Sequence, residues 1–127
     1  MKGFNIGFKT GASPSVVAGK ADKAYGTEYE LTLVNGWTGN VYYKKNDLDQ
    51  VVIYTSNLIV GTGTAGIVIG TLPSGFFNAF NSYFRARRVT VFGMTDIQID
   101  GSTGDVIVLD ATTPGNTIAF NGIINAD

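Results

Sequence analysis

The sequence contains no cysteine and no histidine among its 127 residues. Without cysteine, the chain can form neither a disulfide bond nor a thiolate metal site. Without histidine, it lacks the commonest general base, the usual partner of a serine nucleophile and the common nitrogen ligand of zinc. These absences predict a protein that is not an enzyme, that needs no cofactor or metal, and that is stabilised by packing or by assembly.

Charged residues are also scarce. They make up 15% of the chain, against about 25% in an average soluble domain, whereas apolar residues reach 44% and the mean hydropathy is +0.14. Two explanations stay open: an unusually apolar monomer, or a protomer whose apolar surface is covered by identical neighbours, and we favour the second. The net charge of -1 and the pI near 5.2 predict no basic surface, so no nucleic-acid partner is expected.

The longest stretch without any charged residue runs from Val51 to Phe84. Its length alone would suit a membrane segment, but polar and helix-breaking residues interrupt it at Thr55–Asn57, at Gly61–Thr64 and at Pro73. We therefore expect strands and loops here, and no membrane partner. The first nine residues contain no apolar run of useful length, so no secretory signal peptide is expected.

What the sequence does contain is a series of short segments rich in Val, Ile, Thr, Tyr and Phe, separated by Gly, Asn, Asp and Ser. This pattern is typical of an all-β protein, and the spacing of eight to twelve residues favours an antiparallel β-sandwich or jelly roll. The clearest hairpin joins two alternating segments through Gly101–Gly104. The expected strands are Phe4–Lys9, Tyr29–Val34, Val41–Lys45, Val51–Thr55, Gly66–Thr71, Ser82–Phe92, Asp96–Ile99, Val106–Asp110 and Thr117–Ile123.

The N-terminal part differs from the rest. Ser15–Ala24 could be a short helix or an irregular linker, because Gly19 interrupts its alanines and lysines. We expect residues 1–26 to form a neck, a linker or an extra N-terminal strand, and residues 27–127 to form the β-sandwich domain.

Three segments carry the most specific motifs. Leu31–Gly39 reads LTLVNGWTG and is followed by VYYKKN, Gly66–Phe76 reads GIVIGTLPSGF, and the sequence ends in TIAFNGIINAD from Thr117 to Asp127. In this order they resemble the C-terminal head domains of tail-fibre and baseplate receptor-binding proteins from phages that infect Gram-positive bacteria. The family carries an aromatic residue, Arg and Pro where this chain has Phe76-Phe77-Asn78.

The resemblance implies a β-sandwich or jelly-roll head that forms a homotrimer and binds cell-wall carbohydrate or teichoic acid without performing chemistry. It also implies a place in the virion, at the distal tail or baseplate, with other tail proteins as partners. Because a fold does not fix a function, a non-adhesive structural module of the baseplate or tail fibre stays open as the alternative, and a polysaccharide depolymerase as a third.

The aromatic candidates for ligand binding are Trp37 and Tyr43, together with Tyr83. Trp37 follows Asn35-Gly36 at a strand end, where its indole could stack on a sugar or close the end of the core. Tyr42 and Tyr43 are neighbours on one strand and must face opposite sides, so one ring should be buried and the other exposed.

The polar candidates lie between residues 78 and 87. Arg85 and Arg87 should share one face of a strand, about 7 Å apart, where two guanidinium groups could bind successive phosphates. The alternative is a set of ion pairs with Asp96, Asp100 or Asp105. Nearby amides could bind sugar hydroxyls or could simply be solvated loop residues, and these are Asn78 and Asn81.

Overall fold

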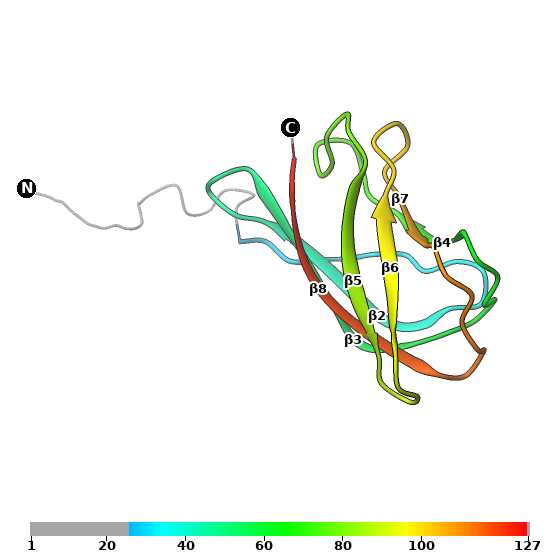
Figure 1. The fold of residues 1–127 in the computed structure, drawn as a ribbon. Helices are drawn as coiled ribbons and strands as arrows, with labels where there is room; N and C mark the ends of the chain where they lie inside the picture. Colours follow the sequence, from blue (N-terminus) through cyan, green and yellow to red (C-terminus); the bar gives the residue numbers. More distant parts are fainter. Residues whose placement is uncertain (1–25, 127) are drawn as a thin grey trace, which may run out of the picture.

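The computed structural model describes residues 26–126, and within them the chain forms a single antiparallel sheet of eight strands (Figure 1). The expectation of an all-β fold is confirmed. No helix is present in this part of the chain, and so none that could cross a membrane. The strands are β1 (Tyr29–Glu30), β2 (Thr38–Lys45), β3 (Gln50–Ile59), β4 (Ile67–Thr71), β5 (Ser82–Arg88), β6 (Met94–Ile99), β7 (Asp105–Val108) and β8 (Thr117–Asn125).

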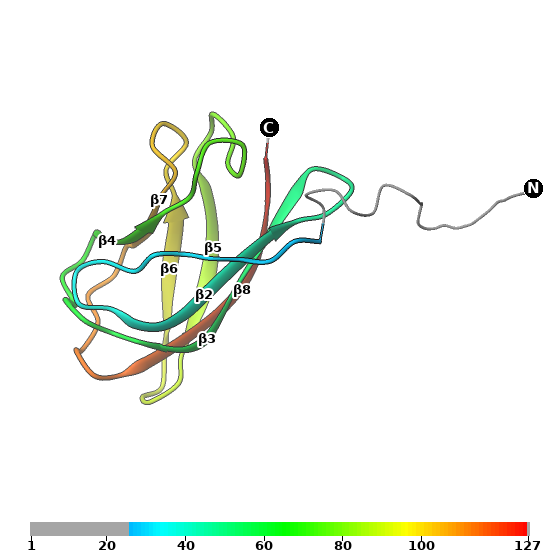
Figure 2. The same cartoon turned by 180° about the vertical axis from the view of Figure 1, so that it is seen from behind.

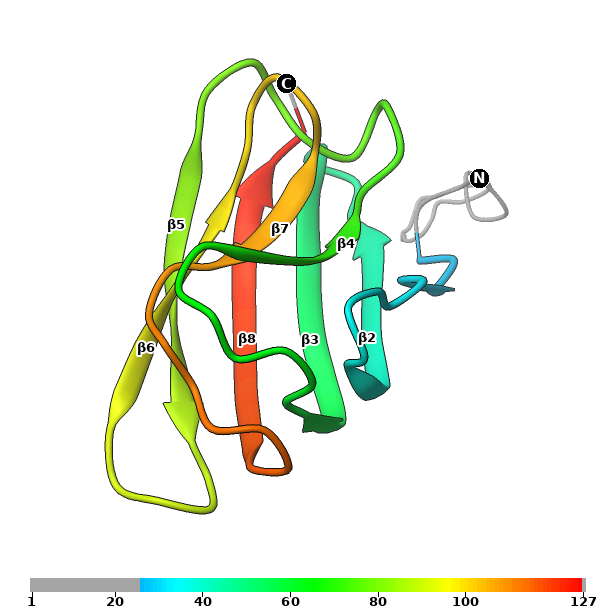
Figure 3. The ribbon, with the colours of Figure 1, turned by 90° about the vertical axis from the view of Figure 1, so that its right-hand side faces the viewer.

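The sheet has the strand order β1-β2-β3-β8-β5-β6-β7-β4 and curls into a half-barrel. Figure 3 shows β4 and β7 crossing in front of β3 and β8, and side chains of all four strands belong to one core cluster. The two halves of one curled sheet therefore face each other across the core, which gives the two-layer arrangement expected from the sequence. β8, the last strand, lies inside the sheet, between β3 and β5.

The gap between the two edges of the sheet is bridged by the segment that follows β1. Leu31 donates its backbone N–H to Val41 of β2, and Val34 donates its own to Ile69 of β4, at 2.7 and 3.0 Å. Figure 2 shows this cyan segment running from β1 toward β4. The close approach depends on Gly70, because a Cβ atom there would lie 2.6 Å from Leu31 Cδ2.

The core follows from the alternation of apolar residues along the strands. On β6, for example, Ile97 and Ile99 are almost fully buried, as expected from their shared face, and β6 pairs with β7 in the predicted hairpin. Each fully buried Ile or Val side chain stabilises the fold by roughly 1.5–3 kcal/mol. The largest fully buried apolar side chains come from six of the strands and from the loop after β4: Val41, Val51, Ile53, Leu58, Ile69, Leu72, Ile97, Ile99, Val106, Val108 and Ile118.

Most strand boundaries lie within three residues of the expected ones, and three strand ends differ by four residues. The strand expected over Tyr29–Val34 ends at Glu30, because the chain then leaves β2 and crosses toward β4. The strand expected over Ser82–Phe92 ends at Arg88, where the backbone N–H bonds to Gly93 O and closes a hairpin turn. The strand expected over Val51–Thr55 continues to Ile59, because Leu58 and Ile59 still pair with β8. The expected strand Phe4–Lys9 and the Ser15–Ala24 segment lie outside the described residues.

One carboxylate connects the start of β6 to the chain after β7. Asp110 Oδ2 accepts hydrogen bonds from the backbone N–H of Asp96, at 2.9 Å, and from the hydroxyl of the buried Thr95, at 3.1 Å. These two bonds, together with the positive charges of Arg88 and Arg85, hold the pKa of Asp110 below its usual value.

Asp110→Asn is therefore expected to lower the free energy of unfolding by about 1 kcal/mol at pH 7. A lowered pKa in the folded state stabilises the protein above the unfolded-state pKa near 3.8, and this stabilisation is lost as the pH falls through the folded-state pKa. Urea denaturation of both proteins, at pH 7 and in steps down to pH 2, measures the free energy of unfolding at each pH. The difference between parent and variant should shrink below pH 3.8, and a difference that stayed constant would contradict the assignment.

Candidate ligand-binding site

The structure does not bring the seven candidate residues together in one place. Two lie in the core, two lie in the loop between β4 and β5, and three lie in a row on the outer face of β5. In that order they are Trp37 and Tyr43, Asn78 and Asn81, and Tyr83, Arg85 and Arg87.

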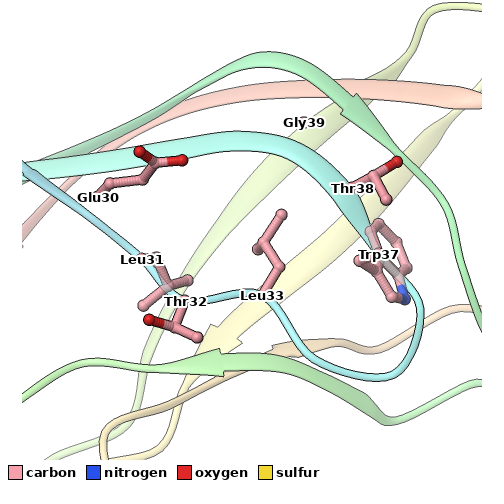
Figure 4. Close-up of a pocket in the computed structure, with 7 residues that line it drawn as sticks. All are labelled: Glu30, Leu31, Thr32, Leu33, Trp37, Thr38 and Gly39. Atoms are coloured by element: carbon pink, nitrogen blue, oxygen red, sulfur yellow. The ribbon is translucent and has the colours of Figure 1, made fainter.

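Trp37 closes one end of the core. Its side chain is only 3% exposed, and its indole Nε1 donates a hydrogen bond of 2.9 Å to Thr62 O. The indole borders a depression of about 460 Å³, and Figure 4 shows the indole nitrogen on the far side of the ring from Glu30 and Leu31. Glu30 Oε2 also has a partner, Asn40 Nδ2, at 2.6 Å. The depression therefore offers a ligand little of the tryptophan ring.

Tyr43 is the inward-facing member of the tyrosine pair, so the ring that can meet a ligand from solvent is that of Tyr42. Tyr43 is 8% exposed and packs against Tyr29 and Phe76, with ring centroids 5.6 and 5.1 Å away. Burial, followed by the charge of Tyr29, raises the pKa of Tyr43. Tyr42 lies on the other face and packs against Tyr54, with centroids 5.6 Å apart.

The two asparagines fix the loop between β4 and β5. Asn78 Nδ2 donates to Asn125 O at 3.1 Å, and its Oδ1 accepts from the backbone N–H of Phe80 at 2.8 Å. Asn81 Oδ1 accepts from the backbone N–H of Gly101 at 2.8 Å. Both side chains thus form hydrogen bonds within the protein, and these bonds explain the two asparagines without a ligand.

The outer face of β5 carries the charged candidates. Tyr83, Arg85 and Arg87 are exposed, and Ala86 between the arginines is fully buried, so the two arginines share a face as expected. Arg85 lies opposite Asp96 in the register of β5 and β6, and its Nε is 3.1 Å from Asp96 Oδ1. The ion pair with Asp96 that the sequence left open is therefore present. Because both side chains are about half exposed or more, it stabilises the fold by at most ~1 kcal/mol.

Arg87 borders a second depression, of about 390 Å³, on the same outer face. We call this depression the outer-face site, and its lining comes from β3, β5 and β8: Tyr54, Thr55, Arg87, Ala119, Phe120 and Asn121. The strand register explains the grouping, since Tyr54 pairs with Asn121 and Arg87 pairs with Ala119. Sequence reasoning missed Tyr54 and Asn121, although each alternates with a buried neighbour, Ile53 or Phe120.

The outer-face site can bind a polar ligand. It combines an aromatic ring, a side-chain amide and a guanidinium group, which suit stacking on a sugar, hydrogen bonding to hydroxyl groups and pairing with an anion. No Asp or Glu is among its lining residues. It therefore lacks the pair of carboxylates that glycoside hydrolysis usually needs.

No protein-family model and no curated protein matches the sequence. Two solved structures are similar in fold. The receptor-binding protein of Listeria phage PSA matches with a TM-score of 0.56 and 16% identity over 78% of this chain. The head domain of lactococcal phage bIL170 matches with a TM-score of 0.58 and 14% identity, again over 78% of this chain.

The matches cover the two phage proteins to different extents. They span 65% of the Listeria phage chain, which is just under two thirds, but 96% of the lactococcal head domain. The resemblance indicated by the sequence motifs is thus confirmed at the level of the fold. The chain has the all-β head-domain fold of these two phage receptor-binding proteins.

Proposed function

We propose that this chain is a receptor-binding head domain of a phage tail, and that it binds a cell-wall carbohydrate or teichoic acid of a Gram-positive host without modifying it. The observation that carries the proposal is the fold match that takes in 96% of the lactococcal phage head domain. The outer-face site supports it, because its tyrosine, asparagine and arginine suit a sugar ligand that carries negative charge.

The proposal includes a homotrimer at the distal tail or baseplate. Support comes from the turn between β5 and β6 and from the first residue of β6, where Val89, Val91, Phe92 and Met94 are all at least 45% exposed. A cluster of exposed apolar side chains is typical of a surface that is covered by a partner. Assembly would also raise the apparent affinity, since heads on one virion engage one cell wall at many points.

A cell-wall pull-down tests this function. The full chain is incubated with purified walls from a panel of Gram-positive strains, before and after chemical removal of teichoic acid, and light scattering in the same buffer gives the number of copies. We expect retention on at least one wall, three copies per particle and no release of soluble sugar. Loss of retention after extraction identifies teichoic acid as the ligand, whereas unchanged retention identifies the remaining wall carbohydrate.

The alternative function predicts another result. If no wall retains the protein while a phage tail protein binds it tightly, the chain is a structural module and the adhesin proposal is overturned. Release of oligosaccharide during incubation would instead overturn the non-catalytic part of the proposal.

A further inference from the structure

Arg85 and Arg87 lie on the same face of β5, but they have different surroundings. Arg85 is opposite Asp96 on β6, and the two form an ion pair of 3.1 Å. Arg87 is opposite Met94 on β6 and opposite Ala119 on β8. Within residues 26–126, Arg87 has no ion-pair partner. Among the described residues no carboxylate pairs with its positive charge, which can attract an anionic ligand, whereas Arg85 is already paired with Asp96.

The neighbours of Arg87 in the outer-face site are suited to the uncharged part of such a ligand. Tyr54 is half-buried and its ring is fixed by packing against Tyr42, at a centroid distance of 5.6 Å. Asn121 is exposed, and its side-chain amide has no hydrogen bond to any described residue. A ring fixed in advance costs little entropy on binding, and a free amide can donate to and accept from hydroxyl groups.

Thr55, by contrast, has a structural part in the site. Its hydroxyl accepts a hydrogen bond of 3.2 Å from the backbone N–H of Phe120, next to the point where the β3–β8 register shifts. This bond holds the two strands together where the depression forms. We expect Thr55 to position Asn121 rather than to contact the ligand directly.

We propose that the outer-face site binds an anionic saccharide, with Arg87 pairing with its phosphate or carboxylate group and with Tyr54 and Asn121 contacting the sugar. This inference deepens the proposed function and rests on it for the biological source of the ligand. It assigns the two arginines different parts: Arg87 recognises the anion, and Arg85 stabilises the β5–β6 pair through Asp96.

NMR titration of the full chain tests the assignment. The backbone amide signals of ¹⁵N-labelled protein are followed during addition of glucose 1-phosphate, glucuronic acid or glucose. We expect either anionic probe to shift the amides around residues 54–55, 87 and 119–121, and glucose to bind more weakly. Binding of both anions indicates recognition of charge alone, and preference for the phosphate indicates recognition of a tetrahedral group.

Arg87→Ala and Arg85→Ala form a matched pair of exposed substitutions on one strand face. Arg87→Ala should weaken binding of glucose 1-phosphate at least about tenfold, while Arg85→Ala should change it by less than about twofold. Thermal unfolding checks that both variants fold. Equal losses in the two variants, no loss in Arg87→Ala, or shifts confined to another surface would overturn the assignment.

The two variants also separate this inference from the proposed function when they are used in the cell-wall pull-down. If the parent binds walls and Arg87→Ala binds them equally well, the function stands and the site assignment fails. If no wall retains the parent but the NMR titration detects binding that depends on Arg87, the anion site stands and the proposed host ligand fails.

Discussion

Replacing Trp37 by alanine is expected to lower the free energy of unfolding by about 3–5 kcal/mol, the usual cost of removing a large buried aromatic side chain. The indole is 3% exposed, and its N–H bonds to Thr62 O in the loop that follows β3. The variant would lose apolar burial and would also leave this carbonyl without its partner. Urea denaturation of parent and variant, monitored by circular dichroism, measures this change in the free energy of unfolding.

Trp37→Phe separates a role in the core from a role in ligand binding. The phenyl ring keeps most of the buried area but cannot donate to Thr62 O, so a loss of about 1–2 kcal/mol is expected. Its binding to cell walls should equal that of the parent. A variant that is as stable as the parent but no longer binds would mean that the indole contacts the ligand after all.

Gly39→Ala is the second substitution with a large expected effect. Gly39 has a φ of 97°, in the region that favours glycine, and it lies where the β2–β3 register shifts. A Cβ atom would lie 2.7 Å from Asn57 C and 2.9 Å from Leu58 Cα, and these backbone atoms cannot rotate away. Strain and overpacking together should lower the free energy of unfolding by about 3 kcal/mol or more.

Gly66→Ala is the matched control, because Gly66 has a similar φ of 81° but open space where its Cβ atom would be. This substitution should cost only the backbone strain, about 1 kcal/mol. Comparing the two denaturation curves therefore isolates the effect of the close contact between β2 and β3. Equal losses of stability in the two variants would show that the backbone of β3 can move to accommodate the added methyl group.

The strands that could be predicted from the sequence are those whose pattern is local. Ile97 and Ile99 alternate with polar residues and precede a glycine-containing turn, and the structure has them buried on one face of the predicted hairpin. The same alternation predicted that Arg85 and Arg87 share a face. A period of two residues is set by the backbone itself, so it can be recognised without knowing what each strand pairs with.

Features that depend on distant pairing could not be predicted in this way. The segment after Glu30 reads as a continuing strand, but it leaves β2 because Val34 pairs with Ile69, 35 residues later in the sequence. Alternation also shows that Tyr42 and Tyr43 face opposite sides without showing which side is the core. Which of the two rings faces the core depends on the direction in which the whole sheet curls.

The outer-face site was missed for the same reason. Its main residues lie far apart in the sequence, at Tyr54, Arg87 and Asn121, and only the order β3-β8-β5 brings them together. Each of them occupies an outward position of an expected strand. Alternation predicts only that each lies on the opposite face from its neighbours in the same strand, whereas their grouping requires the strand order.

The central position of β8 also affects how the chain can fold during synthesis. β3 and β5 have no hydrogen-bonded pairing with each other, and each pairs instead with β8, which is made after both of them. While the ribosome still holds residues 117–125, the hairpins β2–β3 and β5–β6 can form but the curled sheet cannot close. Closure of the sheet therefore has to wait until β8 leaves the exit tunnel, and the apolar faces of the earlier hairpins stay open to other nascent chains until then.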